Sequence, residues 1–192
     1  HREMASGLSA PVGFKNATDG SLNVAINALK SAANPHRFLG INSHGRVALT
    51  RTNGNAHAHV VLRGGDGAPN YDADSVGQCE QALEDSGIEP TIMVDCSHAN
   101  SGKDPSRQPL VLGDIASQIQ QGNRSIIGFM MESNLEFGNQ SVGPEGRDGL
   151  RYGVSITDSC LDWSSTESCL INLAGDIRQA MALRASDQLE PA

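Results

Sequence analysis

The sequence has few cysteines, no long apolar run and no excess of basic residues. Its four cysteines form no CxxC pair and are too sparse for a disulfide scaffold, so we expect a reducing, cytoplasmic compartment. No stretch approaches the roughly 18 uninterrupted apolar residues of a membrane span, so we expect a soluble protein with no membrane association. Lys and Arg number 14 against 22 Asp and Glu, a formal charge of −8, which argues against a nucleic-acid surface.

The chain has 192 residues, of which 38% are hydrophobic, and this suits one domain with a substantial core. We assign residues 1–184 to that domain and 185–192 to a polar tail. The chain begins at His1 and not at a methionine, so we expect it to be processed, trimmed or part of something longer. Any anion must be held by a few local cations, because the overall charge is negative.

Short apolar runs alternate with stretches of helical periodicity. The expected strands are Pro11–Asn16, Arg37–Asn42, His59–Arg63, Thr91–His98 and Ser125–Glu132. The expected helices are Ser21–Ala33, Asp74–Ser86, Pro109–Gln121 and a last helix that begins with a capping box at Ser164–Glu167. Gly87 and Gly122 follow two of these helices as C-terminal stop residues.

This order predicts an α/β fold with a parallel sheet and about five β/α units. An open, doubly wound sheet can have five strands, whereas a (β/α)8 barrel needs eight, and the pattern does not choose between them. The segment Gly45–Thr50 fits a short extra strand or a hairpin.

Ionisable residues stand at the carboxyl ends of four expected strands. Alternate side chains lie on the same face of a strand. Each ionisable residue should therefore face the same way as the apolar or small residues at alternate positions before it: Lys15 as Gly13, Arg63 as Val61, His98 as Val94 and Cys96, and Glu132 as Met130. The carboxyl ends of parallel strands are where ligands bind in α/β proteins. We therefore predict a site at this edge of the sheet, although any one of these residues alone could be structural.

The residue types indicate the chemistry of that site. Lys15 and Arg63 are permanent cations suited to phosphate and carboxylate groups. His98 and Glu132 suit a divalent metal such as Mn, Fe, Co or Zn. Two ligands are too few, and Asp158 is the nearest further acidic candidate, with a turn or helix cap as its alternative role.

Three other features have weaker functional interpretations. His57 and His59 lie on one face of a strand and form a second, less favoured metal pair. The stretch Arg63–Gly67 resembles a phosphate-binding loop but lacks the established spacings, so a tight turn is the better interpretation. Cys96 is expected to be a buried, inert thiol.

Five ordered motifs together resemble a known family. They are PVGFKN at 11–16, LRGG at 62–65, DCSHAN at 95–100, MES at 131–133 with Glu136 and Gly138–Gln140, and YGVSITD at 152–158. From about His1 to Arg184 the chain resembles the carboxyl-terminal portion of class I DAHP synthase (phospho-2-dehydro-3-deoxyheptonate aldolase), a transferase at the entry to the shikimate pathway of aromatic amino acid biosynthesis.

The resemblance implies a (β/α)8 barrel, of which the five units would be strands four to eight. It implies condensation of phosphoenolpyruvate with erythrose 4-phosphate and release of phosphate, with a divalent metal. By the motifs, His98, Glu132 and Asp158 would be metal ligands, Lys15, Arg63 and His98 catalytic, and Lys15, Arg63 and Asp158 substrate-binding. Ser9 and Phe38 would lie in the effector region, where aromatic amino acids inhibit many members, and a homo-oligomer is expected.

Departures from the family pattern limit what the chain is expected to do alone. The family's fourth ligand, a cysteine, has no counterpart among the four cysteines, and the upstream Lys-Pro-Arg-Thr and Ala-Arg-Thr-Thr-Glu-Ser types of segment are absent. We therefore expect low or no activity from this chain by itself. The alternatives are a related phosphoenolpyruvate-dependent sugar-phosphate synthase, such as one using arabinose 5-phosphate, and a noncatalytic fragment that binds metal or phosphate.

Overall fold

The computed structural model describes residues 1–187, and the five residues 188–192 of the expected polar tail lie outside the described part. The strands are β1 (Val12–Lys15), β2 (Arg37–Ile41), β3 (Val47–Arg51), β4 (Ala58–Leu62), β5 (Ile92–Asp95) and β6 (Ile126–Met130). The α-helices are α1 (Arg2–Ala5), α2 (Asn23–Ala33), α3 (Ala73–Glu84), α4 (Gln108–Gln120), α5 (Trp163–Asp176) and α6 (Arg178–Asp187). Three 3-10 turns are η1 (His98–Ser101), η2 (Pro105–Arg107) and η3 (Gly146–Gly149).

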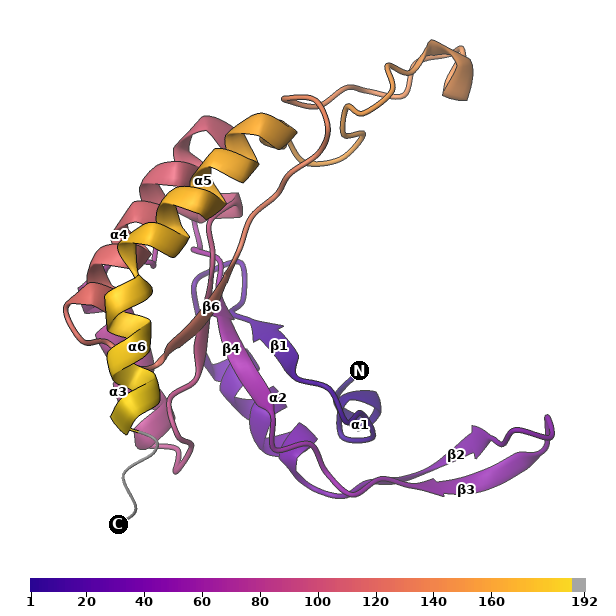
Figure 1. Cartoon of the computed structure of the whole chain (residues 1–192). Helices are drawn as coiled ribbons and strands as arrows, with labels where there is room; N and C mark the ends of the chain where they lie inside the picture. Colours follow the sequence, from indigo (N-terminus) through magenta and orange to yellow (C-terminus); the bar gives the residue numbers. More distant parts are fainter. Residues whose placement is uncertain (188–192) are drawn as a thin grey trace.

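Four strands form one parallel sheet in the order β1-β4-β5-β6. The helices that follow the strands pack against one face of this sheet (Figure 1). The core between them contains Val60 and Leu62 of β4, Val94 of β5, Leu83 of α3 and Ile115 of α4, all nearly or fully buried. The sequence therefore predicted the α/β class and the parallel sheet correctly.

The expected strand Arg37–Asn42 is not part of that sheet, so the prediction of five parallel units is wrong for the described residues. It forms β2, which pairs antiparallel with β3 as a hairpin that projects from the sheet (Figure 1). The connection is a tight turn, in which the Asn42 side chain accepts hydrogen bonds from the backbone of His44 and Arg46, and Gly45 has a φ of 72°. A turn this short joins antiparallel strands, because a parallel pair needs a long crossover. The hairpin alternative for Gly45–Thr50 is confirmed.

Helix ends follow the sequence signals in most places. Gly87 and Gly122 adopt positive φ values of 70° and 102°, as expected of residues that end a helix. The capping box predicted at Ser164–Glu167 is wrong, because the cap of α5 is Asp162, whose carboxylate accepts the Ser165 backbone N–H at 2.8 Å. Near the carboxyl terminus, helix α6 extends to Asp187, two residues beyond the expected start of the tail at 185.

Within residues 1–187, no helix is both long enough and apolar enough to span a membrane.

Candidate functional site

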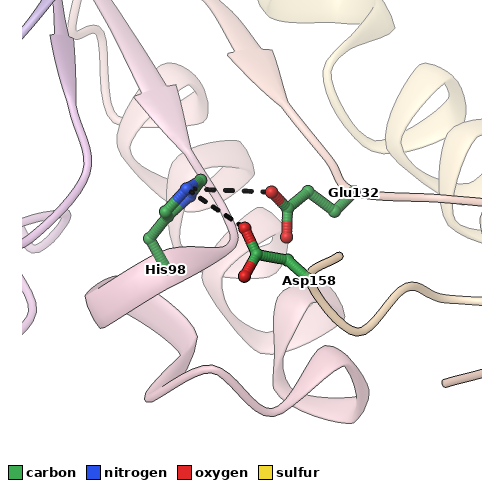
Figure 2. A group of neighbouring side chains, drawn as sticks. All are labelled: His98, Glu132 and Asp158. Carbon is green, nitrogen blue, oxygen red and sulfur yellow. Dashed lines mark ion pairs between the residues drawn. The ribbon is translucent and has the colours of Figure 1, made fainter. Parts of the chain in front are cut away.

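Three side chains from different elements meet at the carboxyl edge of the sheet. His98 begins η1 after β5, Glu132 follows β6, and Asp158 lies on the long segment between β6 and α5 (Figure 2). The His98 Nε2 atom is 3.7 Å from Glu132 Oε1 and 3.9 Å from Asp158 Oδ2. One potential ligand atom from each residue lies within 4.8 Å of the other two. Within the described residues, no other three His, Cys, Asp or Glu side chains come this close together. The structure thus brings together the three residues predicted as metal ligands.

Asp95 holds the opposite side of the imidazole. Its Oδ2 atom lies 2.9 Å from His98 Nδ1 and 2.7 Å from Lys15 Nζ. The Ser97 backbone N–H and hydroxyl donate to the other carboxylate oxygen at 2.9 and 2.6 Å. A carboxylate at Nδ1 favours the tautomer with its proton there, so Nε2 keeps a lone pair directed at Glu132 and Asp158.

The pKa values of the buried Asp95 carboxyl and the partly buried Glu132 carboxyl shift in opposite directions. Burial by itself raises the pKa of Asp95, but hydrogen bonds from Lys15 and Ser97 and the lysine charge outweigh it and leave the pKa below its usual value. The pKa of Glu132 is raised, first by burial and then by the charges of Asp158 and Asp95, against the opposing effects of His98 and Lys15. A cation between Glu132 and Asp158 would relieve that repulsion.

Sequence reasoning placed His98 at this edge correctly but by a wrong argument. Val94 and Cys96 face the helices and the hydrophobic core, so His98 does not continue their face. The residue of β5 that faces the site is Asp95, which the sequence analysis did not select as a site residue. His98 reaches the site because the chain leaves the strand in a turn where His98 has a φ of 53°. The signal for Asp95 was available in the sequence, because Met93 and Asp95 alternate along β5 and so share one face.

The two cations occupy different positions. Lys15 is paired with Asp95, as described above, and its side chain remains 36% exposed. Arg63 is half-buried and lines a neighbouring hollow with Thr18, the Gly64–Gly67 turn and Lys103. Lys103 also lines the hollow that contains His98, Glu132 and Asp158, so the two hollows adjoin. The structure therefore brings Arg63 to the same edge of the sheet without a direct contact to the three-residue cluster.

The Arg63–Gly67 stretch forms a tight turn, as expected. Asn16 accepts the Arg63 backbone N–H through Oδ1 at 2.8 Å and donates to the Gly64 carbonyl at 3.0 Å. Asn70 accepts the Gly64 N–H at 2.7 Å and is in turn anchored by Asn100. These buried and half-buried amides fix the backbone that carries Arg63.

The less favoured metal pair gains no further ligand. His57 is exposed, whereas His59 is buried, and no group of three or more potential metal ligands in the described residues includes either of them. Burial lowers the pKa of His59, which favours its neutral form. Cys96 is fully buried, and burial raises its pKa to about 12, in agreement with an inert thiol.

The two residues predicted for an effector region, Ser9 and Phe38, line one hollow away from this edge. Its other walls come from the segment after α1, from β3 and from Thr52–His57.

The chain is similar in sequence to known proteins. A sequence profile described as the DAHP synthetase I family matches residues 1–170. The chain is 55% identical to the Tyr-sensitive phospho-2-dehydro-3-deoxyheptonate aldolase of Salmonella typhimurium over 97% of this chain and 52% of that protein. It is 46% identical to the phenylalanine-inhibited enzyme of Saccharomyces cerevisiae over 93% of this chain and 50% of that protein.

A solved structure is similar as well. The phospho-2-dehydro-3-deoxyheptonate aldolase of Francisella tularensis superposes with a TM-score of 0.85 and 46% identity, over 93% of this chain and 51% of that one. The chain thus spans about half the length of these relatives. Since the family profile matches most of its residues, the chain belongs to the DAHP synthetase I family.

Proposed function

We propose that this chain carries the metal-binding part of a DAHP synthase site, which condenses phosphoenolpyruvate with erythrose 4-phosphate. The observation that carries the proposal is the convergence of His98, Glu132 and Asp158 from three separate elements. Relatives at 46–55% identity are named phospho-2-dehydro-3-deoxyheptonate aldolases, which supports the reaction. In this reaction the methylene carbon of phosphoenolpyruvate bonds to the aldehyde carbon, water supplies the new ketone oxygen, and inorganic phosphate leaves.

The sheet is proposed to be part of a (β/α)8 barrel. Its strands are all parallel, their helices pack on one face, and within the described residues β1 and β6 each have one neighbouring strand. In such barrels the catalytic groups stand at the carboxyl ends of the strands, which is where His98 and Glu132 lie.

A divalent metal fits the three donors. One imidazole nitrogen and two carboxylates are a mixed N/O set suited to Mn, Fe, Co or Zn, and Asp95 supplies the hydrogen-bonded support that metal-bound histidines usually have. When bound, such an ion supplies Lewis acidity to a carbonyl oxygen or lowers the pKa of a bound water.

The cations are assigned to the substrates. Lys15, which lies within hydrogen-bonding distance of Asp95, and Arg63, on its fixed turn, are proposed to hold the carboxylate and phosphate of phosphoenolpyruvate. Both are catalytic in the sense that they orient the methylene carbon for attack on the aldehyde. His98 is proposed to act through the metal, and Asp158 to contact the second substrate.

Regulation by an aromatic amino acid and a homo-oligomeric, cytoplasmic state complete the proposal. The Salmonella relative is named Tyr-sensitive and the yeast relative phenylalanine-inhibited, which supports an effector at the hollow that Ser9 and Phe38 line. All four cysteines are unpaired, as a reducing compartment requires.

Titration with Mn²⁺ and an assay of phosphoenolpyruvate consumption test the function. We expect saturable Mn²⁺ binding that Glu132→Ala abolishes, while Glu84→Ala, an exposed acid at the end of α3, leaves it unchanged. Turnover by this chain alone should be low, because the family's cysteine ligand and two anion-binding segments have no match in it. Any turnover should require erythrose 4-phosphate and stop on chelation.

Two outcomes would contradict the proposal. A preference for arabinose 5-phosphate would indicate a related sugar-phosphate synthase. Binding of neither Mn²⁺ nor phosphoenolpyruvate by the folded chain would remove the basis of the site.

A further inference from the structure

Gln108, the first residue of α4, is a fully buried polar side chain next to the candidate metal cluster. It follows η1 and η2, so only ten positions separate it from His98. A buried amide is destabilising unless its donor and acceptor are both satisfied. Its hydrogen-bond partners therefore indicate why a glutamine stands there.

Both partners belong to the backbone of Glu132. The Glu132 N–H donates to Gln108 Oε1 at 2.8 Å, and Gln108 Nε2 donates to the Glu132 carbonyl at 3.0 Å. A side-chain amide offers the same donor and acceptor as a peptide group, so Gln108 pairs with Glu132 as a neighbouring strand would.

No strand residue is available for this role on the β5 side. The β5–β6 pairing ends at Asp95 and Met130, followed by a hydrogen bond from the Cys96 N–H to the Met130 carbonyl. Beyond that point the chain after β5 turns into η1, where His98 has its positive φ. Gln108 therefore continues the hydrogen bonding along β6 past the end of β5, as far as Glu132.

The Glu132 carbonyl also accepts the Leu161 N–H at 3.0 Å, three residues after Asp158. The backbone of Glu132 is thus bonded on one side to the helix that follows the His98 turn and on the other to the segment that carries Asp158. This residue is the junction of the three elements that supply the cluster.

We propose that Gln108 is a positioning residue, which fixes the Glu132 backbone and so holds the Glu132 carboxylate opposite His98 Nε2 and Asp158 in the arrangement that binds a metal. The identity of the bound group rests on the function proposed above. The hydrogen-bonded geometry of Gln108 and Glu132 does not depend on it.

The test compares Gln108→Met with Gln118→Met. Gln118 is a second buried glutamine of α4, and its amide donates to the Tyr71 carbonyl and to Asp114, with no bond to Glu132. Both variants remove a buried amide from the same helix at similar volume, so they share any general loss of stability. Only the first removes the support of Glu132.

We expect Gln108→Met to raise the Kd for Mn²⁺ at least about tenfold, the effect typical of losing a supporting hydrogen bond at a metal site. Gln118→Met should change it less than about twofold on the same reasoning. In metal-free protein, hydrogen exchange of the Glu132 amide, normalised to that of Val60 in β4, should accelerate in Gln108→Met and not in Gln118→Met. If Gln108→Met does not fold, Gln108→Asn, which is one methylene too short to bridge both groups, replaces it.

Equal effects of the two variants on Mn²⁺ affinity, or an unchanged normalised exchange rate at Glu132, would overturn the proposal. Absence of Mn²⁺ binding by the wild-type chain would instead contradict the proposed metal site. The normalised exchange rates would then decide by themselves whether Gln108 positions Glu132.

Discussion

Gly65 illustrates how closely two backbone segments approach beside the site. A Cβ atom on Gly65 would overlap the backbone nitrogen of Gly20, and rigid backbone does not relieve such a contact. We expect Gly65→Ala to lower the free energy of unfolding by about 1–3 kcal/mol, the usual effect of overpacking.

Gly77 in α3 is the matched control. Apart from its chain neighbours and the backbone of its own helix turn, no atom lies within 4 Å of a Cβ placed there, so Gly77→Ala should stabilise the chain by about 0.5–1 kcal/mol through lower backbone entropy of the unfolded state. Urea denaturation measures both changes. The same sign for the two variants would show that the close approach of Gly65 and Gly20 is not what disfavours alanine at position 65.

Single residues also mark the limit of what alternation along a strand predicts. Lys15, Val61 and Met130 share one face of the sheet, as their registers with the neighbouring strands require, so Lys15 and Glu132 were predicted for the right reason. His98 was predicted for the wrong reason, because it lies beyond the end of β5, where alternation no longer holds. Asp95 lies inside β5, and alternation from Met93 would have selected it. Beyond the strand end, the direction of each side chain depends on the φ and ψ angles of the turn, which the apolar pattern does not predict.

Among the helices, two N-termini share one capping pattern. Asp72 and Asp162 each accept the backbone N–H of a serine three residues later, and that serine's hydroxyl donates to the same carboxylate. The sequence pattern Asp-x-x-Ser was therefore the signal for both caps. The capping-box rule selected Ser164 instead, because a serine followed by a glutamate three residues on is the commoner signature.

The Asp72 cap makes a testable contribution to α3. Asp72→Ala should lower the free energy of unfolding by about 1 kcal/mol at neutral pH, whereas Asp74→Ala, which removes an exposed acid without a cap bond, should have a smaller effect. Thermal unfolding of both variants against the wild type measures the difference.

The contribution of Asp72 depends on pH in a defined direction. Burial alone raises the pKa of its carboxyl, but the hydrogen bonds from Ser75 outweigh this and leave the pKa below its usual value. A lowered folded-state pKa adds stability that is complete above the unfolded value of about 3.9 and is lost as the pH falls through the folded value. The gap between wild type and Asp72→Ala should therefore narrow below about pH 4. A gap that widens in acid would contradict this assignment.

Elements differ in how far the sequence determines their partners. The apolar strands β4 and β5 were predicted as members of a parallel sheet because their continuous apolar runs require burial on both faces. The strand β2 was predicted for the same sheet because it too is a short apolar run, but in the structure its residues alternate between exposed and partly buried, as in a hairpin with one open face. The pattern thus identified β2 as a strand and could not identify its partner.

At the scale of the whole molecule, the hairpin presents an apolar surface that nothing in the described residues covers. Leu39, Ile41, Val47 and Leu49 lie on one face of β2 and β3, with exposed fractions of 68–77%. Leu39 is directly opposite Leu49, and Ile41 opposite Val47, so the four side chains form one patch. Exposed apolar patches on a projecting element are typical of association surfaces, and open hairpin edges add unpaired backbone groups.

We expect the chain to self-associate through this patch. Light scattering at micromolar concentration should give a mass above the 20.2 kDa of one chain, and Leu39→Lys combined with Leu49→Lys should return it toward that value. The two lysines place like charges on the patch, and association would have to remove those charges from water. The opposite face of the hairpin keeps its wild-type side chains. Leu110→Lys, at an equally exposed leucine of α4 that lies outside the hairpin, should leave the mass as in the wild type. A monomeric wild-type chain, or an equal effect of Leu110→Lys, would show that the hairpin is not the surface through which copies associate.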